Sequence, residues 1–393
     1  MLSNKLKNIT PSYTIGISSK VAQLQEKGIS ICNLSIGEPD FNVPIKAKDV
    51  AIDALNNNKT KYDSVSGVNE LKQEIIRKLK DENNANYDLD EIVISSGAKH
   101  AITNTLISIL NPGDEVLVPK PYWVSYPEMI KLCSGVPVFV DTDRKNNFKI
   151  TVSDIKKNIS SKTKMLFLSN PSNPTGAIYT REELENIVDI CIKNNIYILA
   201  DEIYEKISYE DDFVSIASLS SKAKDITITI NGFSKSVAMT GMRVGYSASN
   251  KTISRGISTV QGHLVSHPST ISQWCAYGAL KYCSNDIDDM VKIYKKKRDL
   301  AIDMLSKINY IDYIYPKGAF YMFIDISNLK NKLDYKDSFS VEFCDKLLSN
   351  NNVAAVPGIA FGMDDYIRIS YACSEENLVN GIKGIEEFVN SLL

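Results

Sequence analysis

Short apolar segments alternate with amphipathic helical segments from about residue 90 to residue 250, and this alternation constrains the fold more than any other feature. Strands that are buried on both faces appear as near-continuous apolar runs, and the helices between them cover the two faces of a mostly parallel sheet. The pattern therefore predicts a doubly wound α/β sheet. The predicted strands are Ile92–Ile94, Val116–Val118, Val136–Val140, Met165–Leu168, Ile196–Ala200 and Ile226–Ile230.

One helix of this region has a well-defined start. Thr180 and Glu183 have the spacing of a capping box, in which each residue satisfies a backbone N–H group of the other. Apolar residues then recur at helical spacing and predict one buried stripe. The stripe consists of Leu184, Ile187, Val188, Cys191 and Ile192.

The pattern changes after about residue 285, where a charged helix (YKKKRDLAIDMLSKI) precedes three further strand candidates. These candidates are Ala319–Ile324, Val353–Val356 and Tyr366–Ser370. They indicate a smaller α+β unit, and a chain of 393 residues is long enough for two domains. We predict a large domain over residues 46–284 and a small domain made of residues 1–45 and 285–393.

The composition is that of an ordinary globular protein, with 44% hydrophobic and 23% charged residues. The 45 Lys and Arg residues nearly balance the 47 Asp and Glu residues, so the charge favours neither nucleic acid nor an anionic membrane as a partner. The apolar runs are shorter than the roughly 20 residues that span a bilayer. Seven scattered cysteines without a CxxC pair are typical of reduced thiols in a cytoplasmic protein.

Polar and aromatic residues follow five of the predicted strands, at the edge where open α/β sheets bind ligands. Singly, each has an ordinary structural explanation, such as a helix cap, a turn former or a surface ion pair. Together the five strand ends provide five kinds of group. The first is a pair of small residues that open a helix, where a phosphate can bind. The others are a flat aromatic ring, an amide, a carboxylate with a phenol, and a lysine with an arginine. This set suits an anionic, planar, heteroaromatic aldehyde. The residues are Gly97 and Ala98, Trp123, Asn173, Asp201 and Tyr204, and Lys235 with Arg243.

The sequence closely resembles the class I/II aminotransferases, the aspartate-aminotransferase-like branch of the fold-type I enzymes that use pyridoxal phosphate. The resemblance covers essentially the whole chain, and its motifs fall in the order that the family has. The motifs are PYWVSYPE (121–128), SNPSNPTG (169–176), ADEIYE (200–205), NGFSKSVAMTGMRVGY (231–246) and YIRISYACSEENL (366–378).

The resemblance implies a role for each matching residue. Lys235 would carry the cofactor as a Schiff base and act as general acid and base, as a desolvated lysine can. Asp201 would pair with the pyridine nitrogen, and Tyr204 and Asn173 would bind the ring oxygen. Trp123 would stack on the ring. The phosphate would be held by Gly97, Ala98, Ser234 and Arg243, and by Tyr62 of a neighbouring subunit, which implies a homodimer with shared sites.

Substrate binding follows from the same resemblance. Arg368 would bind the substrate α-carboxylate through its planar fork, with Gly37 in contact through its backbone. Lys99 and Thr14 resemble positions that bind the distal carboxylate of aspartate, although Lys99 is equally well explained as a solvated helix residue. We therefore expect transfer of an amino group from L-aspartate to 2-oxoglutarate.

Two alternatives stay open at this point, and two others are disfavoured. The enzyme could transfer the amino group of aromatic, alanine-like or prephenate-type substrates, or it could be a C–S β-lyase of the same fold. A regulator that binds a ligand without catalysis is disfavoured, because the chain has no basic surplus. A nicotinamide-binding enzyme is disfavoured because no GxGxxG follows a predicted strand.

Overall fold

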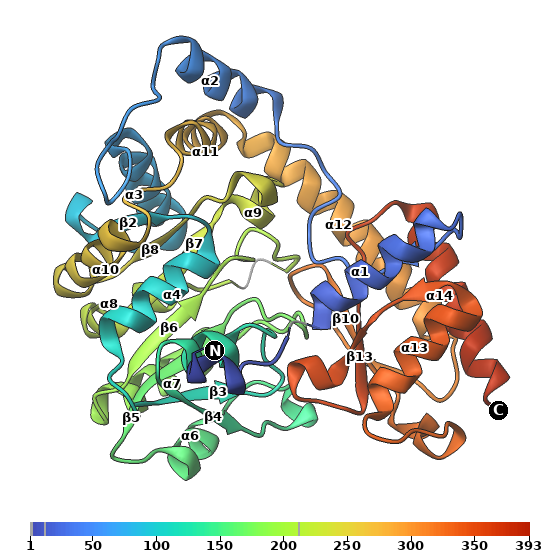
Figure 1. The fold of residues 1–393 in the computed structure, drawn as a ribbon. Coiled ribbons are helices and arrows are strands. Elements are labelled where there is room, and N and C mark those ends of the chain that lie inside the picture. Colours follow the sequence, from blue (N-terminus) through green and yellow to red (C-terminus); the bar gives the residue numbers. More distant parts are fainter. Residues whose placement is uncertain (1–2, 12, 211–212) are drawn as a thin grey trace.

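The computed structural model describes residues 3–11, 13–210 and 213–393, and its centre is a seven-stranded sheet (Figure 1). The strand order is β2-β8-β7-β6-β5-β3-β4, and every pair is parallel except those that β8 forms. All six predicted strands lie in this sheet, which confirms the predicted fold class. The strands are β2 (Ile92–Ser95), β3 (Glu115–Pro119), β4 (Val136–Val140), β5 (Thr163–Ser169), β6 (Tyr197–Asp201), β7 (Thr227–Gly232) and β8 (Gly245–Ala248).

Helices cover both faces of the sheet, because successive strand residues point to opposite sides. Along β3, Val116 and Val118 pack in the cluster that contains residues of α4 (Ala98–Ile109) and α10 (Lys251–Leu264). Leu117 packs on the other face, against α7 (Arg181–Lys193).

The helix α7 begins at the predicted capping box of Thr180 and Glu183. Four of the five residues predicted for its apolar stripe are buried, and the fifth, Ile192, is only partly buried.

The remaining helices frame the sheet, and α2 packs closely on α11 above one end of it. None of the helices in the described part of the chain is both long and apolar enough to cross a membrane. The remaining helices around the large sheet are α2 (Ile45–Asn56), α3 (Asn69–Asn83), α5 (Tyr126–Leu132), α6 (Val152–Asn158), α8 (Ser221–Ile226), α9 (Phe233–Ser236) and α11 (Thr270–Tyr282).

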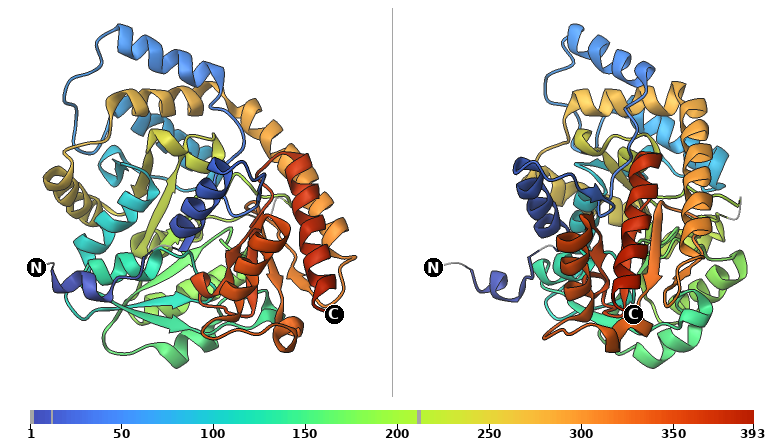
Figure 2. Two further views of the ribbon diagram at one scale, coloured as in Figure 1. Left: turned by 45° about the vertical axis from the view of Figure 1, so that its right-hand side comes forward. Right: turned by 90° about the vertical axis from the view of Figure 1, so that its right-hand side faces the viewer.

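The C-terminal part of the chain forms a second, smaller unit, and Figure 2 shows its orange and red elements gathered on one side of the molecule. Its antiparallel sheet has the order β12-β13-β10-β9. The predicted charged helix is the C-terminal part of α12. The elements are β9 (Asp312–Ile314), β10 (Tyr321–Asp325), β12 (Val356–Pro357), β13 (Tyr366–Ser370), α12 (Ser284–Leu305), α13 (Phe339–Asn351) and α14 (Glu375–Ser391).

The prediction of one strand over Val353–Val356 is wrong. The segment is divided between β11 (Val353–Ala354), which pairs with β1 (Cys32–Asn33), and β12, which pairs with β13. The run is apolar throughout, so nothing in it marks the point at which the chain leaves one sheet for the other.

Part of the N-terminal segment packs on this smaller unit. The parallel pair β1–β11 joins them, and α1 (Tyr13–Glu26) contributes Val21 to a cluster with Leu348 and Ala354. The first residues instead contact α5 of the large unit, because the Thr10 amide donates to Glu128 at 3.0 Å and Lys131 donates to the Asn8 carbonyl at 3.3 Å. The predicted division into residues 46–284 and residues 1–45 with 285–393 stays a prediction.

Candidate active site

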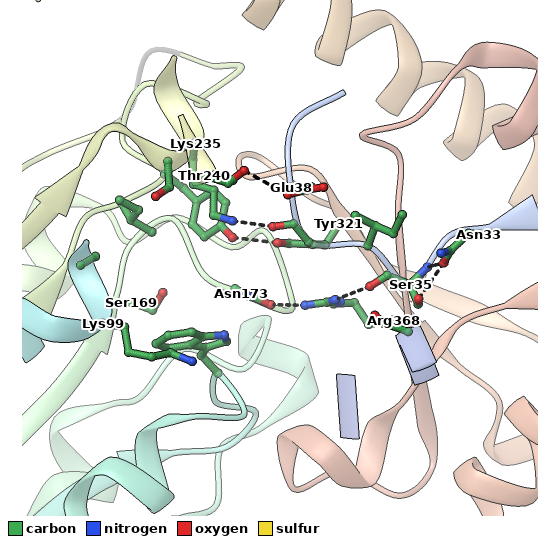
Figure 3. A pocket seen from close by; sticks show the side chains of 18 of the residues that line it. Asn33, Ser35, Glu38, Lys99, Ser169, Asn173, Lys235, Thr240, Tyr321 and Arg368 are labelled. Atoms are coloured by element: carbon green, nitrogen blue, oxygen red, sulfur yellow. Dashed lines mark hydrogen bonds between the residues drawn. The ribbon is translucent and has the colours of Figure 1, made fainter. Parts of the chain in front are cut away.

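A cavity of about 670 Å³ lies at the carboxyl edge of the large sheet, between that edge and the small unit (Figure 3). The ends of β5, β6 and β7 contribute one wall, and residues 35–38, Tyr321 and Arg368 contribute the opposite wall. Most of the predicted site residues line this cavity. They are Gly37, Ala98, Lys99, Trp123, Asn173, Asp201, Tyr204, Ser234, Lys235, Arg243 and Arg368.

Lys235 lies in the short helix α9, directly after β7. Its ammonium group donates a hydrogen bond to the carbonyl of Gly37 across the cavity, and no described carboxylate forms an ion pair with it. Burial lowers the pKa of Lys235 to about 8, and the positive charge of Arg368 acts in the same direction. An amine of this kind is partly neutral near physiological pH and can act as a nucleophile and a base.

Asp201 is the last residue of β6 and is 5% exposed. Its Oδ2 accepts a hydrogen bond of 2.6 Å from the Tyr126 hydroxyl, and its Oδ1 accepts one of 3.3 Å from the Ile203 amide. Burial raises the pKa of Asp201, whereas these two donors and the charge of Lys235 oppose the rise. The site therefore holds a buried carboxylate that an additional proton donor would stabilise.

Arg368 is 3% exposed and has no carboxylate partner among the described residues. Its Nη1 donates to Asn173 Oδ1 at 3.0 Å and its Nη2 to the Ser35 carbonyl at 3.1 Å, as Figure 3 shows. The remaining nitrogen, Nε, is buried and has no hydrogen-bond partner within the described part of the chain. Because a buried cation is costly unless it is paired, this arrangement favours an anionic ligand. Burial also lowers the pKa of Arg368.

The opposite end of the cavity suits a second anion. Gly97 precedes α4 with φ +87°, and a Cβ atom at this position would overlap the Arg243 guanidinium. Arg243 is fixed by a hydrogen bond of 2.7 Å to the Thr240 carbonyl. The first N–H groups of a helix have no acceptor within it, so Ala98 and Ser234 supply donors beside this arginine.

The residues predicted for the distal carboxylate are less fully described. The Lys99 ammonium lies 5.0 Å from the centre of the Trp123 ring. It forms no ion pair within the described residues, and burial lowers its pKa. Lys99 is nevertheless exposed overall, so its interpretation as a solvated helix residue and its interpretation as a ligand of the distal carboxylate both stay predictions. Thr14 lies in the first turn of α1, and its side chain is outside the part that the structure describes.

Tyr62 does not line the cavity. It is 91% exposed and packs edge-on against the His267 ring, with the ring centres 5.8 Å apart. A side chain so placed is available to a neighbouring molecule, and its predicted role stays a prediction.

Comparison with known proteins gives one result throughout. The family model for aminotransferase class I and II matches residues 29–385. The chain belongs to this family. It is 42% identical to an aspartate aminotransferase of Bacillus sp. (strain YM-2) over 99% of both chains. It is 41% identical to a probable aspartate/prephenate aminotransferase of Rickettsia typhi over 100% of both. The solved structure of the Thermus thermophilus aspartate aminotransferase with maleate has a TM-score of 0.93, with 34% identity over 99% of both chains.

Two aromatic residues of this aminotransferase site were missed by the sequence analysis. Tyr126 lies in a recognised motif but only its contact with Asp201 reveals a role. Tyr321 lies in a predicted strand and would be taken for a core residue, yet its hydroxyl is 2.7 Å from that of Tyr204. Neither contact is local in sequence, so no spacing signal could have identified them.

Proposed function

We propose that this enzyme transfers the amino group of L-aspartate to 2-oxoglutarate with the help of pyridoxal phosphate, giving oxaloacetate and L-glutamate. The observation that carries the proposal is the pairing, in one cavity, of a lysine whose pKa is lowered to about 8 with a buried arginine whose Nε lacks a partner. The carboxylate of an amino acid would pair with the arginine, and the amine of Lys235 would be free to bind the cofactor and to move a proton at the substrate Cα.

The donors around the cavity fit pyridoxal phosphate. Lys235 is the amine that would bind it covalently, and Asp201 is the buried carboxylate that would hold its ring nitrogen protonated. The space that a Cβ of Gly97 would fill is closed by Arg243, which leaves a cradle of main-chain donors and one guanidinium for the phosphate. The ring would lie against Trp123, with its oxygen near Tyr204 and Asn173.

When bound, the cofactor supplies the carbonyl carbon that accepts the amino group and a ring that withdraws electrons from the substrate Cα. The protein supplies the proton transfers and the orientation. Lys235 would remove the proton from Cα and return one to the acceptor carbon, which its lowered pKa favours near neutral pH. Arg368 would hold the α-carboxylate and so fix which Cα bond faces Lys235.

The preference for a dicarboxylic substrate rests on Lys99. This ammonium group borders the cavity without an ion pair among the described residues, so a second carboxylate would gain a partner there. The relative from Thermus thermophilus was solved with maleate, a dicarboxylate, which supports the same substrate class. Thr14 would assist from the N-terminal segment.

A homodimer with shared sites follows as part of the proposal. The exposed Tyr62 would reach the phosphate of the other subunit. A location in the cytoplasm also stays a prediction.

The test is a visible spectrum of the purified protein after loading with pyridoxal phosphate. We expect an absorption band that L-aspartate bleaches and 2-oxoglutarate restores, and that is absent from Lys235→Ala. Lys99→Met should weaken the response to aspartate but keep that to alanine. An unchanged band with aspartate, together with a response to aromatic amino acids, alanine or glutamate plus prephenate, would contradict the assignment of L-aspartate as the amino donor. Release of pyruvate from cystathionine would identify a β-lyase instead.

A further inference from the structure

Tyr321 lies where the two walls of the cavity meet. It is the first residue of β10, is 1% exposed, and pairs with Ser370 of β13 in antiparallel register. Side chains that are diagonal neighbours on such a pair share a face of the sheet, and Arg368 is the diagonal neighbour of Tyr321. The register therefore places the ring of Tyr321 against the Arg368 guanidinium, 4.2 Å from the ring centre to Cζ.

The hydroxyl of Tyr321 makes a contact in the other direction, toward the large sheet. It shares a hydrogen bond of 2.7 Å with the hydroxyl of Tyr204, which follows β6. A Cβ atom at Gly37 would lie only 3.1 Å from the same oxygen, so the main chain at this glycine encloses the hydroxyl. One side chain thus contacts the arginine expected to bind the substrate and the tyrosine expected to bind the cofactor.

We propose that Tyr321 is a positioning residue that couples the two binding partners of the site. Its ring holds the Arg368 guanidinium in the orientation that receives a carboxylate, and its hydroxyl fixes the direction of the Tyr204 phenol. This inference rests on the proposed function, since it concerns the same cofactor and substrate groups. The two contacts use different parts of one side chain, so two substitutions separate them.

Tyr321→Phe keeps the ring against Arg368 and removes the hydrogen bond to Tyr204. We expect the pH midpoint of the cofactor absorption band to shift by about 0.5 to 1 pH unit, as loss of one neutral hydrogen bond implies. The affinity of the cofactor-free protein for maleate, measured by calorimetry, should stay within about twofold of the wild type.

Tyr321→Leu removes both the ring and the hydroxyl. The band should shift as in the phenylalanine variant, and maleate should bind about 3- to 30-fold more weakly because the Arg368 cation no longer lies against an aromatic ring.

A matched control exists in the same core. Tyr371 and Tyr209 form another buried pair of phenols, 3.1 Å apart, outside the cavity. Tyr371→Phe removes the contacts of this hydroxyl with Tyr209 and with the Ala319 carbonyl, and it should change neither the band midpoint nor the affinity for maleate.

The outcomes distinguish the coupling from the proposed function. A wild-type protein with neither an absorption band nor affinity for maleate would overturn the proposed function together with the coupling. If the wild type shows the band and binds maleate, either of two results would overturn the coupling alone. Tyr321→Phe could leave the band midpoint unchanged, or Tyr371→Phe could move the midpoint as far as Tyr321→Phe does. Equal affinity of Tyr321→Leu and the wild type for maleate would overturn the role of the ring.

Discussion

Replacement of Arg368 by lysine tests the central claim about substrate binding. The guanidinium donates to Asn173 and Ser35 and keeps its Nε without a partner, so a carboxylate can be bound through two parallel hydrogen bonds. Lysine keeps the charge but offers a single ammonium group in place of the planar fork. The substitution thus removes the planar pair of hydrogen-bond donors and keeps the positive charge.

The expected magnitude follows from the interactions that lysine cannot make. One hydrogen bond to a charged group contributes about 1.5–3 kcal/mol, and the less complete packing of lysine between Tyr321 and Phe361 adds to this. A total of about 2–4 kcal/mol corresponds to a decrease of about 30- to 1,000-fold in kcat/KM for L-aspartate. Arg368→Gln also leaves the carboxylate without a counter-charge, and about 3–5 kcal/mol is expected.

The assay is steady-state kinetics with L-aspartate and 2-oxoglutarate, together with thermal unfolding of each variant. Arg298→Lys is the control, because Arg298 is equally buried and is paired with Asp299 at 2.8 Å, away from the cavity. It should keep its kcat/KM. A kcat/KM of Arg368→Lys within about threefold of the wild type, in a folded protein, would refute the assignment of Arg368.

Three further predictions concern the lysine, the phosphate cradle and a buried carboxyl group. The pKa of Lys235 is lowered to about 8, so in the cofactor-free protein its labelling by acetic anhydride should rise with a midpoint near pH 8; a midpoint near 10.4, that of an exposed lysine, would contradict this. Gly97→Ala should weaken binding of pyridoxal phosphate at least about tenfold, because the added Cβ would meet Arg243. Gly113 has a similar φ but open space around it, so Gly113→Ala should leave this affinity unchanged. Equal affinities of the two variants for pyridoxal phosphate, measured by titration, would disprove the phosphate cradle. Burial raises the pKa of Glu202 to about 8, so the folded protein binds more protons than the unfolded chain between about pH 4.5 and 8 and loses about 1.4 kcal/mol of stability per pH unit across that window. Glu202→Gln should abolish this slope in urea unfolding at pH 6 and 8, and an unchanged slope would count against the shift.

The parts of the site that could be predicted from the sequence follow an apolar run directly. Asp201 ends β6 and Lys235 lies just beyond β7, and the buried residues of both strands are continuous in sequence. The carboxyl ends of parallel strands meet at one edge, so the order of elements is enough to bring these residues together. The strand β8 was missed because Gly245–Ala248 has no apolar run, and its burial comes from pairing with β2 and β7.

The wall that binds the carboxylate could not be derived in this way. Arg368 donates to the carbonyl of Ser35, which is 333 residues away, and the Ser370 amide donates to the Leu34 carbonyl at 2.7 Å. Both contacts depend on the pairing of β1 with β11, and the sequence pattern around Cys32–Asn33 is too short to predict a strand. Before the structure, only the resemblance to a known family assigned Arg368 its role.

The two walls of the site come from different parts of the chain. The middle of the chain supplies the amine, the carboxylate and the phosphate cradle, whereas the two ends supply the arginine and the main chain around Gly37. Several hydrogen bonds cross between these parts, among them those from Lys235 to Gly37, between Tyr204 and Tyr321, and from Arg368 to Asn173. Each of these three involves a group that the ligands would also contact. A bound ligand must replace or extend these hydrogen bonds. Ligand binding therefore changes the same contacts that align the two walls of the cavity.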